Sequence, residues 1–430
     1  MTEILVLVLS FMVLLLLGVP IAFCIGISTT LTMLLSIQTM PALTTVAQRM
    51  ATGLDSFALL AIPFFILAGQ LMNRGGVARR LIDLAKAMVG MLPGGLAYVN
   101  ILACMLFGAI SGSAAAAAAA IGGFMTPLMS KEGYDKNFSA AVNITSSTTG
   151  LLIPPSNILI VYSLASGGVS IAALFLAGYV PGIVVGLALM IVAGSLAYIK
   201  KYPVGDRVAF KEAFRRFLDA IPSLSLLVVV MGGILAGYFT ATEASAIAVL
   251  YTFILSVLIY REVKWKEIPQ ILLDSAATTA IVMLLIGTSM GMSWIMSYEN
   301  IPQGVSEALI SLSDNKVVIL LIINLILLFV GTFMDMTPAV LIFTPIFLPV
   351  VMKLGMDPIH FGIILVLNLC IGLCTPPVGS VLFIGCGVAN TTVIKVLKPL
   401  IPMFIAMIVA LVLVTYIPAL SLALPRAFGF

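Results

Sequence analysis

Charged residues are scarce in this sequence. Only 9% of its 430 residues are charged, 62% are hydrophobic, and the mean hydropathy is +1.23. A soluble globular domain carries about 25% charged residues, so a chain this poor in charge cannot cover a water-facing surface. The composition therefore excludes a soluble enzyme, a nucleic-acid-binding protein and a disordered scaffold.

Residues suited to catalysis and to metal binding are scarce as well. The chain has one histidine, His360, and five cysteines, all of which sit in apolar stretches. We expect the cysteines to be buried apolar side chains rather than metal ligands. The histidine is expected to lie outside the apolar spans, which leaves no catalytic triad. No P-loop pattern is present, so the sequence predicts neither an enzyme nor an ATP-driven transporter, and no cofactor.

Apolar runs of about 20 residues recur along the whole chain, which predicts an all-α polytopic membrane protein. Two apolar units, 95–129 and 317–352, are broken near their middle, and residues 40–53 are expected to form a polar connector. The expected spans lie at about 4–19, 20–37, 55–72, 138–165, 171–199, 219–239, 242–260, 270–297, 361–388 and 399–421.

Basic residues fall mainly on one side of these spans. Seventeen of the 21 lysines and arginines lie on that side, and the other side receives only Arg49, Lys316, Lys353 and Arg426. Cytoplasmic loops carry an excess of Lys and Arg, so the rich side is predicted to be cytoplasmic and both termini periplasmic. The basic linker at 200–218 is then cytoplasmic.

The two halves of the chain resemble each other. Residues 150–157 match residues 372–379 at an offset of 222, and both segments contain a Pro-Pro pair after a glycine. Two glycine pairs have nearly the same offset: Gly108 with Gly331, and Gly69 with Gly291. Five spans in each half is an odd number, so residues 1–199 and 219–430 are predicted to be inverted repeats, which are typical of secondary transporters.

The Pro-Pro pairs interrupt two of the spans. A proline inside a helix has no N–H and frees the carbonyl four residues earlier. The expected free carbonyls are therefore those of Gly150, Leu151, Gly372 and Leu373. Carbonyls at membrane depth, surrounded by Ser, Thr and Asn side chains, suit Na⁺. The alternative is a pair of proline kinks whose hydroxyls bond to their own backbone; the symmetry of the two breaks favours ion sites.

The two broken units are expected to be re-entrant hairpins. In the first, Ser111-Gly112-Ser113 separates two arms of about 16 residues, or roughly 24 Å, which falls short of a comfortable span. The tip would then lie near the middle of the bilayer, at a helix N-terminus that favours anionic groups.

Asp335 lies in the second broken unit, and the 17 residues on each side of it carry no charge. A carboxylate at membrane depth costs about 3 kcal/mol on insertion scales, so such a residue usually serves function. A nearby Na⁺ would offset its charge; the alternative is that Asp335 only caps a helix at a water-exposed tip. Other acids are expected to be helix caps or to sit at helix starts: Glu243, Asp55 and Asp274.

Together these motifs resemble a known family. Their order, Ser111-Gly112-Ser113, Pro154-Pro155-Ser156-Asn157, Asp335-Met336-Thr337-Pro338 and Thr375-Pro376-Pro377-Val378-Gly379, is that of the large membrane subunit of tripartite ATP-independent periplasmic (TRAP) transporters. The resemblance implies Na⁺-coupled uptake of an organic acid, either sialic acid or a C4-dicarboxylate, across the bacterial inner membrane. It also implies two partners, a small four-helix membrane subunit and a periplasmic substrate-binding protein.

The resemblance further implies an elevator mechanism, in which a transport part slides against a static scaffold. The expected scaffold comprises residues 1–53 and 219–268. The expected transport part comprises residues 54–199, with hairpin 95–129 and broken helix 138–165, and residues 269–430, with hairpin 317–352 and broken helix 361–388.

Site residues follow from the matching motifs. The resemblance implies a first sodium site at Ser111, Ser113, Gly150, Pro154, Ser156 and Asn157, and a second at Asp335, Thr337, Gly372, Thr375 and Pro377. The substrate would lie between the hairpin tips, against Ser111, Gly112, Ser113, Asn157, Asp335, Met336 and Gly379. No basic residue is expected at membrane depth, which argues against an arginine clamp on the substrate carboxylate. Two alternatives stay open: a stand-alone Na⁺/carboxylate symporter and an ion channel.

Overall fold

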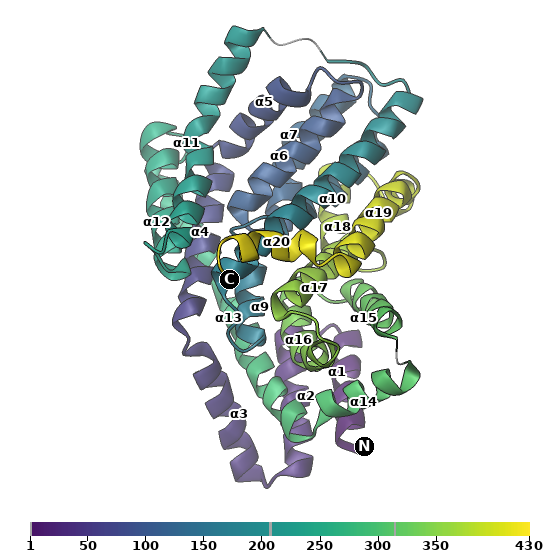
Figure 1. Cartoon of the computed structure of the whole chain (residues 1–430). Coiled ribbons are helices and arrows are strands. Elements are labelled where there is room, and N and C mark those ends of the chain that lie inside the picture. The colour runs from purple at the N-terminus through teal and green to yellow at the C-terminus, as the bar shows by residue number, and fades with distance from the viewer. Residues whose placement is uncertain (1, 206–208, 314) are drawn as a thin grey trace.

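The computed structural model describes residues 2–205, 209–313 and 315–430, and almost all of these lie in helices (Figure 1). Within these residues the only β pairing is an isolated bridge between Pro93 and Val204. The predicted all-α class is therefore confirmed. Residues 206–208 of the basic linker lie outside the described residues.

The described residues of the first half form ten α-helices and two 3₁₀ turns. Its elements are α1 (Thr2–Leu16), α2 (Ile21–Ser36), α3 (Thr39–Leu54), η1 (Phe57–Leu60), α4 (Ala61–Arg74), α5 (Val77–Val89), α6 (Gly95–Ser111), α7 (Ala114–Lys131), α8 (Lys136–Ser147), η2 (Thr148–Leu151), α9 (Asn157–Ala165) and α10 (Ile171–Ile199).

The described residues of the second half are also almost all helical. Its elements are α11 (Phe210–Leu235), α12 (Ala241–Phe253), the π-helical η3 (Ile254–Ile259), η4 (Trp265–Glu267), α13 (Ile268–Tyr298), α14 (Ile301–Leu312), α15 (Lys316–Gly331), α16 (Met336–Lys353), α17 (Pro358–Gly372), α18 (Ser380–Val388), α19 (Val393–Tyr416) and α20 (Ala419–Ala427). Seven helical segments in the described residues are long and apolar enough to cross a membrane, and five apolar helices are shorter.

The connector predicted at residues 40–53 is helical: these residues form helix α3, which is not among the candidate membrane spans. Pro41 does not prevent this: it lies in the first helical turn, where a backbone N–H has no partner inside the helix. Only Ala42 of α3 is buried, and α3 packs along α13. Asp55 lies at the C-terminal end of this helix and not at a helix start.

The two ends of the molecule differ in the elements that they contain. In Figure 1, α5, the C-terminal end of α10 and the N-terminal end of α11 lie at one end, and α3 and α14 lie at the opposite end with the start of α1. Helix α5 leads into α6, whereas α14 leads into α15, so the two broken units are entered from opposite ends.

Both broken units are pairs of packed helices. Helices α6 and α7 contact each other, as do α15 and α16. Each pair also packs against an interrupted helix through glycines. A Cβ placed on Gly150 would lie 2.1 Å from the Cα of Gly108, and one placed on Gly372 would lie 2.5 Å from Gly331. Backbones meet directly at these crossings, so they tolerate no side chain.

Helices α4 and α13 occupy a central position. Helix α4 packs along α12 and α13, while α13 packs along α2 and α3. On their other side α4 contacts α6 and α9, and α13 contacts α16. These two helices therefore separate the outer helices from the hairpins and the interrupted helices.

The glycine crossings generate a stability prediction. Gly150→Ala should lower the free energy of unfolding by about 1–3 kcal/mol, because its methyl group would overlap the backbone of Gly108. The matched control is Gly123→Ala in α7, where a Cβ meets nothing within 4 Å and alanine favours a helix. Thermal unfolding in detergent measures both; equal midpoints would contradict the crossing.

Candidate functional site

The tip of the first hairpin is a short turn between α6 and α7. Gly112 has φ +60°, a left-handed conformation that glycine adopts without strain. The Ser113 hydroxyl accepts a hydrogen bond from the Ala116 amide (3.2 Å) and so caps the N-terminus of α7. Ser111 is buried, and its hydroxyl donates to the Ser113 carbonyl at 3.5 Å. The structure thus brings the three predicted tip residues together at the beginning of a helix.

The tip of the second hairpin carries Asp335. This residue is in the N-cap position of α16, but its side chain accepts no capping hydrogen bond from the backbone. The Ser380 hydroxyl, at the start of α18, donates to Asp335 Oδ1 at 3.5 Å. Asp335 is exposed, so its carboxylate is open to a ligand or to water.

The two interrupted helices bend at the predicted positions. Helix α8 and η2 end at Leu151 and α9 starts at Asn157, whereas α17 ends at Gly372 and α18 starts at Ser380. Both Pro-Pro peptide bonds are cis. The prediction that the breaks occur at Pro154-Pro155 and Pro376-Pro377 is confirmed.

Three of the four carbonyls predicted to be free accept hydrogen bonds. The Leu151 carbonyl accepts from the Ser156 hydroxyl. The Gly372 carbonyl accepts from the Thr375 amide (2.9 Å), and that of Leu373 from the Leu382 amide (3.3 Å). The chain folds back at each break and so supplies local donors. Each carbonyl oxygen has two lone pairs, so a second position remains for an ion.

The hydroxyls near the first break also bond locally. Those of Thr145, Ser146, Ser147, Thr148 and Thr149 all donate to carbonyls three or four residues earlier. This is the arrangement expected of proline kinks. Asn143 donates from Nδ2 to the Ala118 carbonyl (2.9 Å) and joins α8 to α7. These side chains therefore hold the break in shape, and any ion contact would use their remaining lone pairs.

A cavity of about 240 Å³ lies where the two tips and the two breaks meet. Helices α7, α9, α16 and α18 all begin at this cavity, so four helix N-termini face it. Its walls are formed by Gly112, Ser113, Ala114, Ala115, Leu151, Asn157, Ile158, Val161, Asp335, Met336, Thr337, Leu373, Ser380 and Val381, and by Ile62, Ile66, Thr278 and Val282 of α4 and α13.

Six of the predicted site residues line this cavity: Gly112, Ser113, Asn157, Asp335, Met336 and Thr337. The other predicted residues lie in the tips and breaks but are not part of its wall: Ser111, Gly150, Pro154, Ser156, Gly372, Thr375, Pro377 and Gly379. Thr278, Ile62, Ile66 and Val282 were not among the predicted site residues. Nothing in their local sequence distinguishes them from other lipid-facing or core positions, because their role depends on where α4 and α13 pack.

The cavity wall combines a single charged side chain with the partial charges of helix ends. Asp335 is the only charged residue in its wall as the structure describes it. The side-chain oxygen of Asn157, from the first break, is buried and has no hydrogen-bond partner in the described residues. The cavity therefore combines one carboxylate and an unpartnered amide oxygen with four helix N-termini, each of which favours negative charge.

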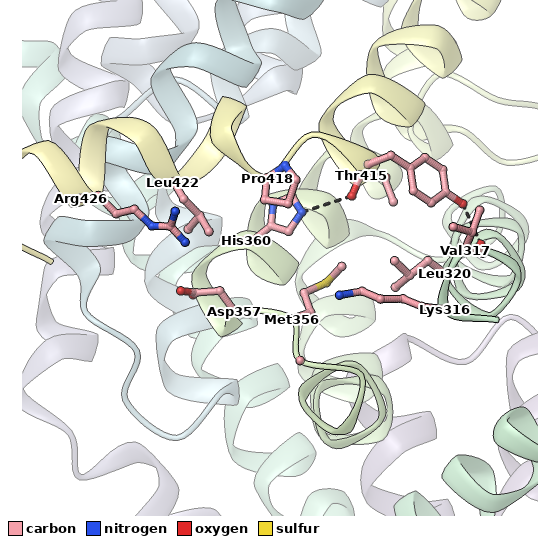
Figure 2. A pocket seen from close by; sticks show the side chains of 12 residues that line it. Lys316, Val317, Leu320, Met356, Asp357, His360, Thr415, Pro418, Leu422 and Arg426 are labelled. Carbon is pink, nitrogen blue, oxygen red and sulfur yellow. Dashed lines mark hydrogen bonds between the residues drawn. The ribbon is translucent and has the colours of Figure 1, made fainter. Parts of the chain in front are cut away.

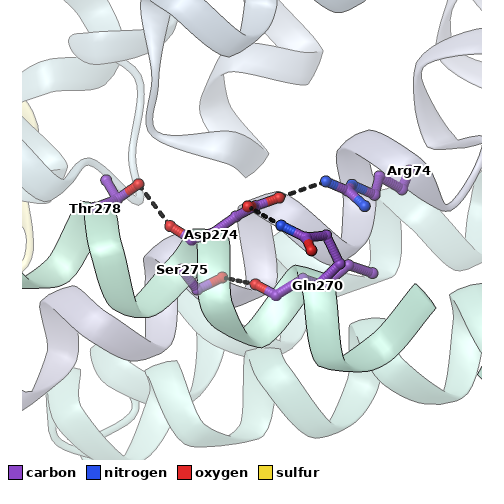
Figure 3. Close-up of polar contacts among 6 residues, drawn as sticks. Arg74, Gln270, Asp274, Ser275 and Thr278 are labelled. Atoms are coloured by element: carbon purple, nitrogen blue, oxygen red, sulfur yellow. Dashed lines mark hydrogen bonds and ion pairs between the residues drawn. The ribbon is translucent and has the colours of Figure 1, made fainter. Parts of the chain in front are cut away.

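A charged cluster close to the cavity joins α4 to α13. Asp274 receives hydrogen bonds from Arg74 and from Gln270, and Figure 3 shows these two side chains converging on its carboxylate. Asp274 is inside α13, one turn from the cavity residue Thr278, so the prediction that it sits at a helix start is wrong. Arg74 and Asp274 are 200 residues apart in the sequence, so no local pattern reveals their ion pair.

Glu243 caps a helix as predicted, through a capping box with Thr240.

A second cavity of about 360 Å³ lies between α15, α17, α19 and α20 and holds none of the predicted site residues. Lys316 and Arg426 extend into it from opposite ends (Figure 2). His360 lies in α17 and is buried, so the prediction that it lies outside the apolar spans is wrong. Its Nδ1 is 2.6 Å from the Ser421 hydroxyl and its Nε2 is 3.2 Å from the Thr415 carbonyl, which explains how a helix interior accommodates it.

The described residues contain no group of three or more His, Cys, Asp or Glu side chains that could hold a metal ion together. All five cysteines are free and buried, as predicted. Oxygen atoms of hydroxyls, amides, carbonyls and Asp335 are thus the ligands that the cavity offers, and these suit a hard cation.

Comparison with known proteins identifies the family. A family model described as "Tripartite ATP-independent periplasmic transporter, DctM component" matches residues 8–420. The chain belongs to this family. It is 57% identical to the uncharacterized protein YgiK of Salmonella typhimurium, across 98% of this chain and 96% of YgiK.

Two further TRAP relatives are named for their substrates. The chain is 39% identical to the C4-dicarboxylate TRAP transporter large permease protein DctM of Rhodobacter capsulatus, across 97% of each chain. It is 37% identical to the sialic acid TRAP transporter large permease protein SiaM of Vibrio cholerae, across 89% of each chain. These relatives are transporter permeases and not enzymes. Membership of the TRAP family favours the first of the three functions expected from the sequence.

Among solved structures, the fold is similar to that of the YdaH transporter of Alcanivorax borkumensis. The TM-score is 0.65 at 13% sequence identity, with 88% of each chain covered. At this identity the likeness shows a shared fold alone.

The cavity generates an accessibility prediction. A cysteine at position 337, in the cavity wall, should react with a small thiol reagent at least about tenfold faster than one at position 344, because exposure controls thiol reactivity. Both residues are threonines on α16, and Thr344 is fully buried. Labelling of purified protein, followed by mass spectrometry, measures both rates. The five native cysteines are buried and provide the background, and equal rates at the two positions would contradict the cavity.

Proposed function

We propose that this protein is the large membrane subunit of a TRAP transporter that couples inward Na⁺ movement to the uptake of an organic acid. Membership of the family rests on the match over residues 8–420. The coupling ion, the substrate class and the mechanism are inferences from the cavity between the hairpin tips.

The charge of the cavity supports Na⁺ coupling. An organic acid carries a negative charge, and the only charged side chain in the described cavity wall, Asp335, is negative as well. Two carboxylates in one cavity repel each other unless a cation lies between or beside them. Bound Na⁺ would remove this repulsion, so that substrate and ion bind together. This charge balance is the observation on which the proposal depends.

Helix N-termini would bind the substrate anion, and the C-terminal ends of other helices would bind the cations. The N-termini of α7, α9, α16 and α18 carry partial positive charge and would face the substrate carboxylate. The C-terminal ends of η2 and α17 present carbonyl oxygens at the breaks, which suit Na⁺. We assign the first sodium site to the Ser111–Ser113 tip with the first break, and the second to Asp335 and Thr337 with the second break.

The proposed substrate is an organic acid whose carboxylate is not bound by an arginine side chain. The curated relatives act on C4-dicarboxylates and on sialic acid, which share a carboxylate. Arg74 lies about two helical turns beyond Ile66, the last cavity residue of α4, and is paired with Asp274, so it is not free to bind the substrate in this conformation. Helix N-termini and the hydroxyls of Ser113, Thr337 and Ser380 would therefore hold the carboxylate.

The packing of α4 and α13 supports an elevator mechanism built on inverted repeats. These helices contact the predicted scaffold helices α2, α3 and α12 on one side and the hairpins on the other. Only four residues of α4 and α13 face the cavity, and the remaining wall comes from the tips, the breaks and the helices that follow them. We therefore place α4 and α13 with the scaffold, which moves the proposed boundaries from residues 54 and 269 to the ends of these helices. The hairpins and interrupted helices would slide along them.

The proposed partners follow from the family. A small membrane subunit would hold the scaffold, and a periplasmic binding protein would deliver the substrate. The protein is proposed to lie in the inner membrane, with the basic end that contains α5 and the α10–α11 connection facing the cytoplasm and both termini facing the periplasm.

Ion coupling should depend on Asp335 and Thr375. Asp335→Asn removes a full negative charge and should raise the Na⁺ concentration for half-maximal uptake about tenfold, equivalent to about 1.4 kcal/mol of binding. Thr375→Ala should act in the same direction with a smaller effect. Uptake into proteoliposomes across a series of Na⁺ gradients measures the shift. Glu307→Gln on α14, an exposed acid outside the cavity, is the control, and an unchanged Na⁺ dependence in Asp335→Asn would overturn the second site.

The small subunit should dock on the scaffold. A partner fixed to the hairpins would have to move with them, so crosslinks from the partner should form with α1, α2, α11 or α12 and should leave transport intact. Paired cysteines on the two subunits, oxidised in membranes before an uptake assay, test this. Crosslinks that form instead with α7 or α16 would contradict the division into scaffold and transport part.

A further inference from the structure

A third cavity, of about 460 Å³, lies away from the proposed transport site, where α5, α11 and the end of η3 meet. None of its wall residues lines the transport cavity. They are Arg79, Arg80, Asp83, Arg216, Leu218, Asp219, Pro222, Ile259, Tyr260 and Glu262. Six of these ten residues carry charge, in a chain in which charge is rare.

Arg80 is held in place before any ligand arrives. Its guanidinium carbon lies 3.6 Å from the centre of the Tyr260 ring, and Nη1 donates to the Gly76 carbonyl at 3.0 Å. The same nitrogen is 4.0 Å from the Glu262 carboxylate. The Tyr260 hydroxyl is in turn hydrogen-bonded to Ser223 at 3.1 Å. Because stacking and hydrogen bonds fix the guanidinium, an anion loses little side-chain entropy on binding to it.

Arg216 has unused hydrogen-bonding capacity. Its Nε donates to Glu212, one turn earlier on α11, at 3.0 Å. Its Nη1 is buried and has no hydrogen-bond partner among the described residues. Buried donors are almost always paired, so this nitrogen calls for an acceptor that the described residues do not provide. Phosphate oxygens are a suitable acceptor, because guanidinium and phosphate match in geometry.

The balance of charge in this cavity selects a dipolar ligand. Three arginines are accompanied by three carboxylates, those of Asp83, Asp219 and Glu262. A purely anionic ligand would be repelled by the carboxylates as strongly as the arginines attract it. A ligand with a phosphate and an ammonium group satisfies both sets, since the ammonium can donate to carboxylates while the phosphate accepts from guanidiniums.

Two apolar wall residues indicate that this ligand belongs to the membrane. Leu218 and Ile259 are 48% and 58% exposed, and they belong to α11 and η3, both parts of candidate membrane spans. Further exposed apolar residues follow on the same elements, namely Phe214, Phe217, Ile221 and Leu258. The part of this surface that the proposed small subunit leaves uncovered is solvated by acyl chains, and a charged cavity at its edge is placed to receive the headgroup.

We propose that this cavity binds the headgroup of a zwitterionic aminophospholipid, such as phosphatidylethanolamine, at the end of the membrane where the basic residues are concentrated. Arg80 and Arg216 hold the phosphate, Asp83 and Asp219 hold the ammonium, and Leu218 and Ile259 contact the first part of the acyl chains. The proposal is independent of the ion and substrate assigned to the transport cavity. By joining α5 to α11, the lipid stabilises the contact between the helix that precedes the first hairpin and the scaffold.

Native mass spectrometry of the purified full-length chain tests the phosphate contact. Dimyristoyl phosphatidylethanolamine should bind the unmodified chain, and Arg216→Gln should weaken this binding about tenfold. Two controls are matched to it. Arg215→Gln removes the neighbouring exposed arginine, which is not in the wall, and Glu212→Gln removes the ion-pair partner of Arg216 but leaves the wall intact. Both controls should bind like the unmodified chain; equal weakening in all three variants would overturn the site.

Lipids with other headgroups test the dipolar character. The unmodified chain should prefer phosphatidylethanolamine to phosphatidylglycerol about tenfold, and Asp83→Asn with Asp219→Asn should abolish this preference. Equal or tighter binding of phosphatidylglycerol to the unmodified chain would overturn the role of the carboxylates. Soluble phosphoethanolamine should not compete at concentrations at which the lipid binds, because it lacks acyl chains. Displacement by phosphoethanolamine at such concentrations would show a site for soluble phosphate compounds and would overturn the lipid assignment.

Discussion

Backbone polar groups that leave a helix inside a membrane must find partners within the protein, and this constraint explains the architecture around the cavity between the hairpin tips. The chain interrupts two helices and folds two hairpins in the same small volume. At the interrupted helices it satisfies the freed carbonyls with nearby hydroxyls and amides, as at Leu151, Gly372 and Leu373. The two breaks and the two hairpin tips also create four helix N-termini, which are directed at one cavity. The same breaks that need local compensation thus create the electrostatic field that favours an anion.

Close approach of backbones keeps this arrangement together. The crossings of Gly108 with Gly150 and of Gly331 with Gly372 leave no room for a methyl group. The polyalanine start of α7 has the same consequence, because small side chains allow helices to approach where the hydrophobic effect gives no driving force. Each hairpin is thereby held against the break of its own half of the chain, while α4 and α13 contribute only a few residues to the cavity wall. This division is compatible with a transport part that moves as a unit.

Several elements could be predicted from the sequence because their determinants are local. Helix α10 has the predicted bounds of 171–199, and both hairpins and both Pro-Pro breaks lie within a few residues of their predicted positions. Uncharged apolar length, glycines and prolines decide these features without help from distant residues. The predictions that were wrong concern residues whose environment depends on contacts with distant parts of the chain. His360 is accommodated in α17 by Thr415 and Ser421, and Asp274 is paired with Arg74 from a helix 200 residues away.

The sequence by itself determined the membrane class, the positions of the interruptions and the family, because hydropathy, Pro-Pro pairs and ordered motifs are properties of contiguous residues. It also identified the six motif residues that line the cavity. Only the tertiary structure decided that Thr278, Ile62, Ile66 and Val282 complete its wall, and that Arg80, Arg216, Asp83 and Asp219 converge on a second polar site. Both sites are assembled from helices far apart along the chain. A polar residue acquires its role there from the neighbours that packing brings to it, and this information is absent from any local pattern.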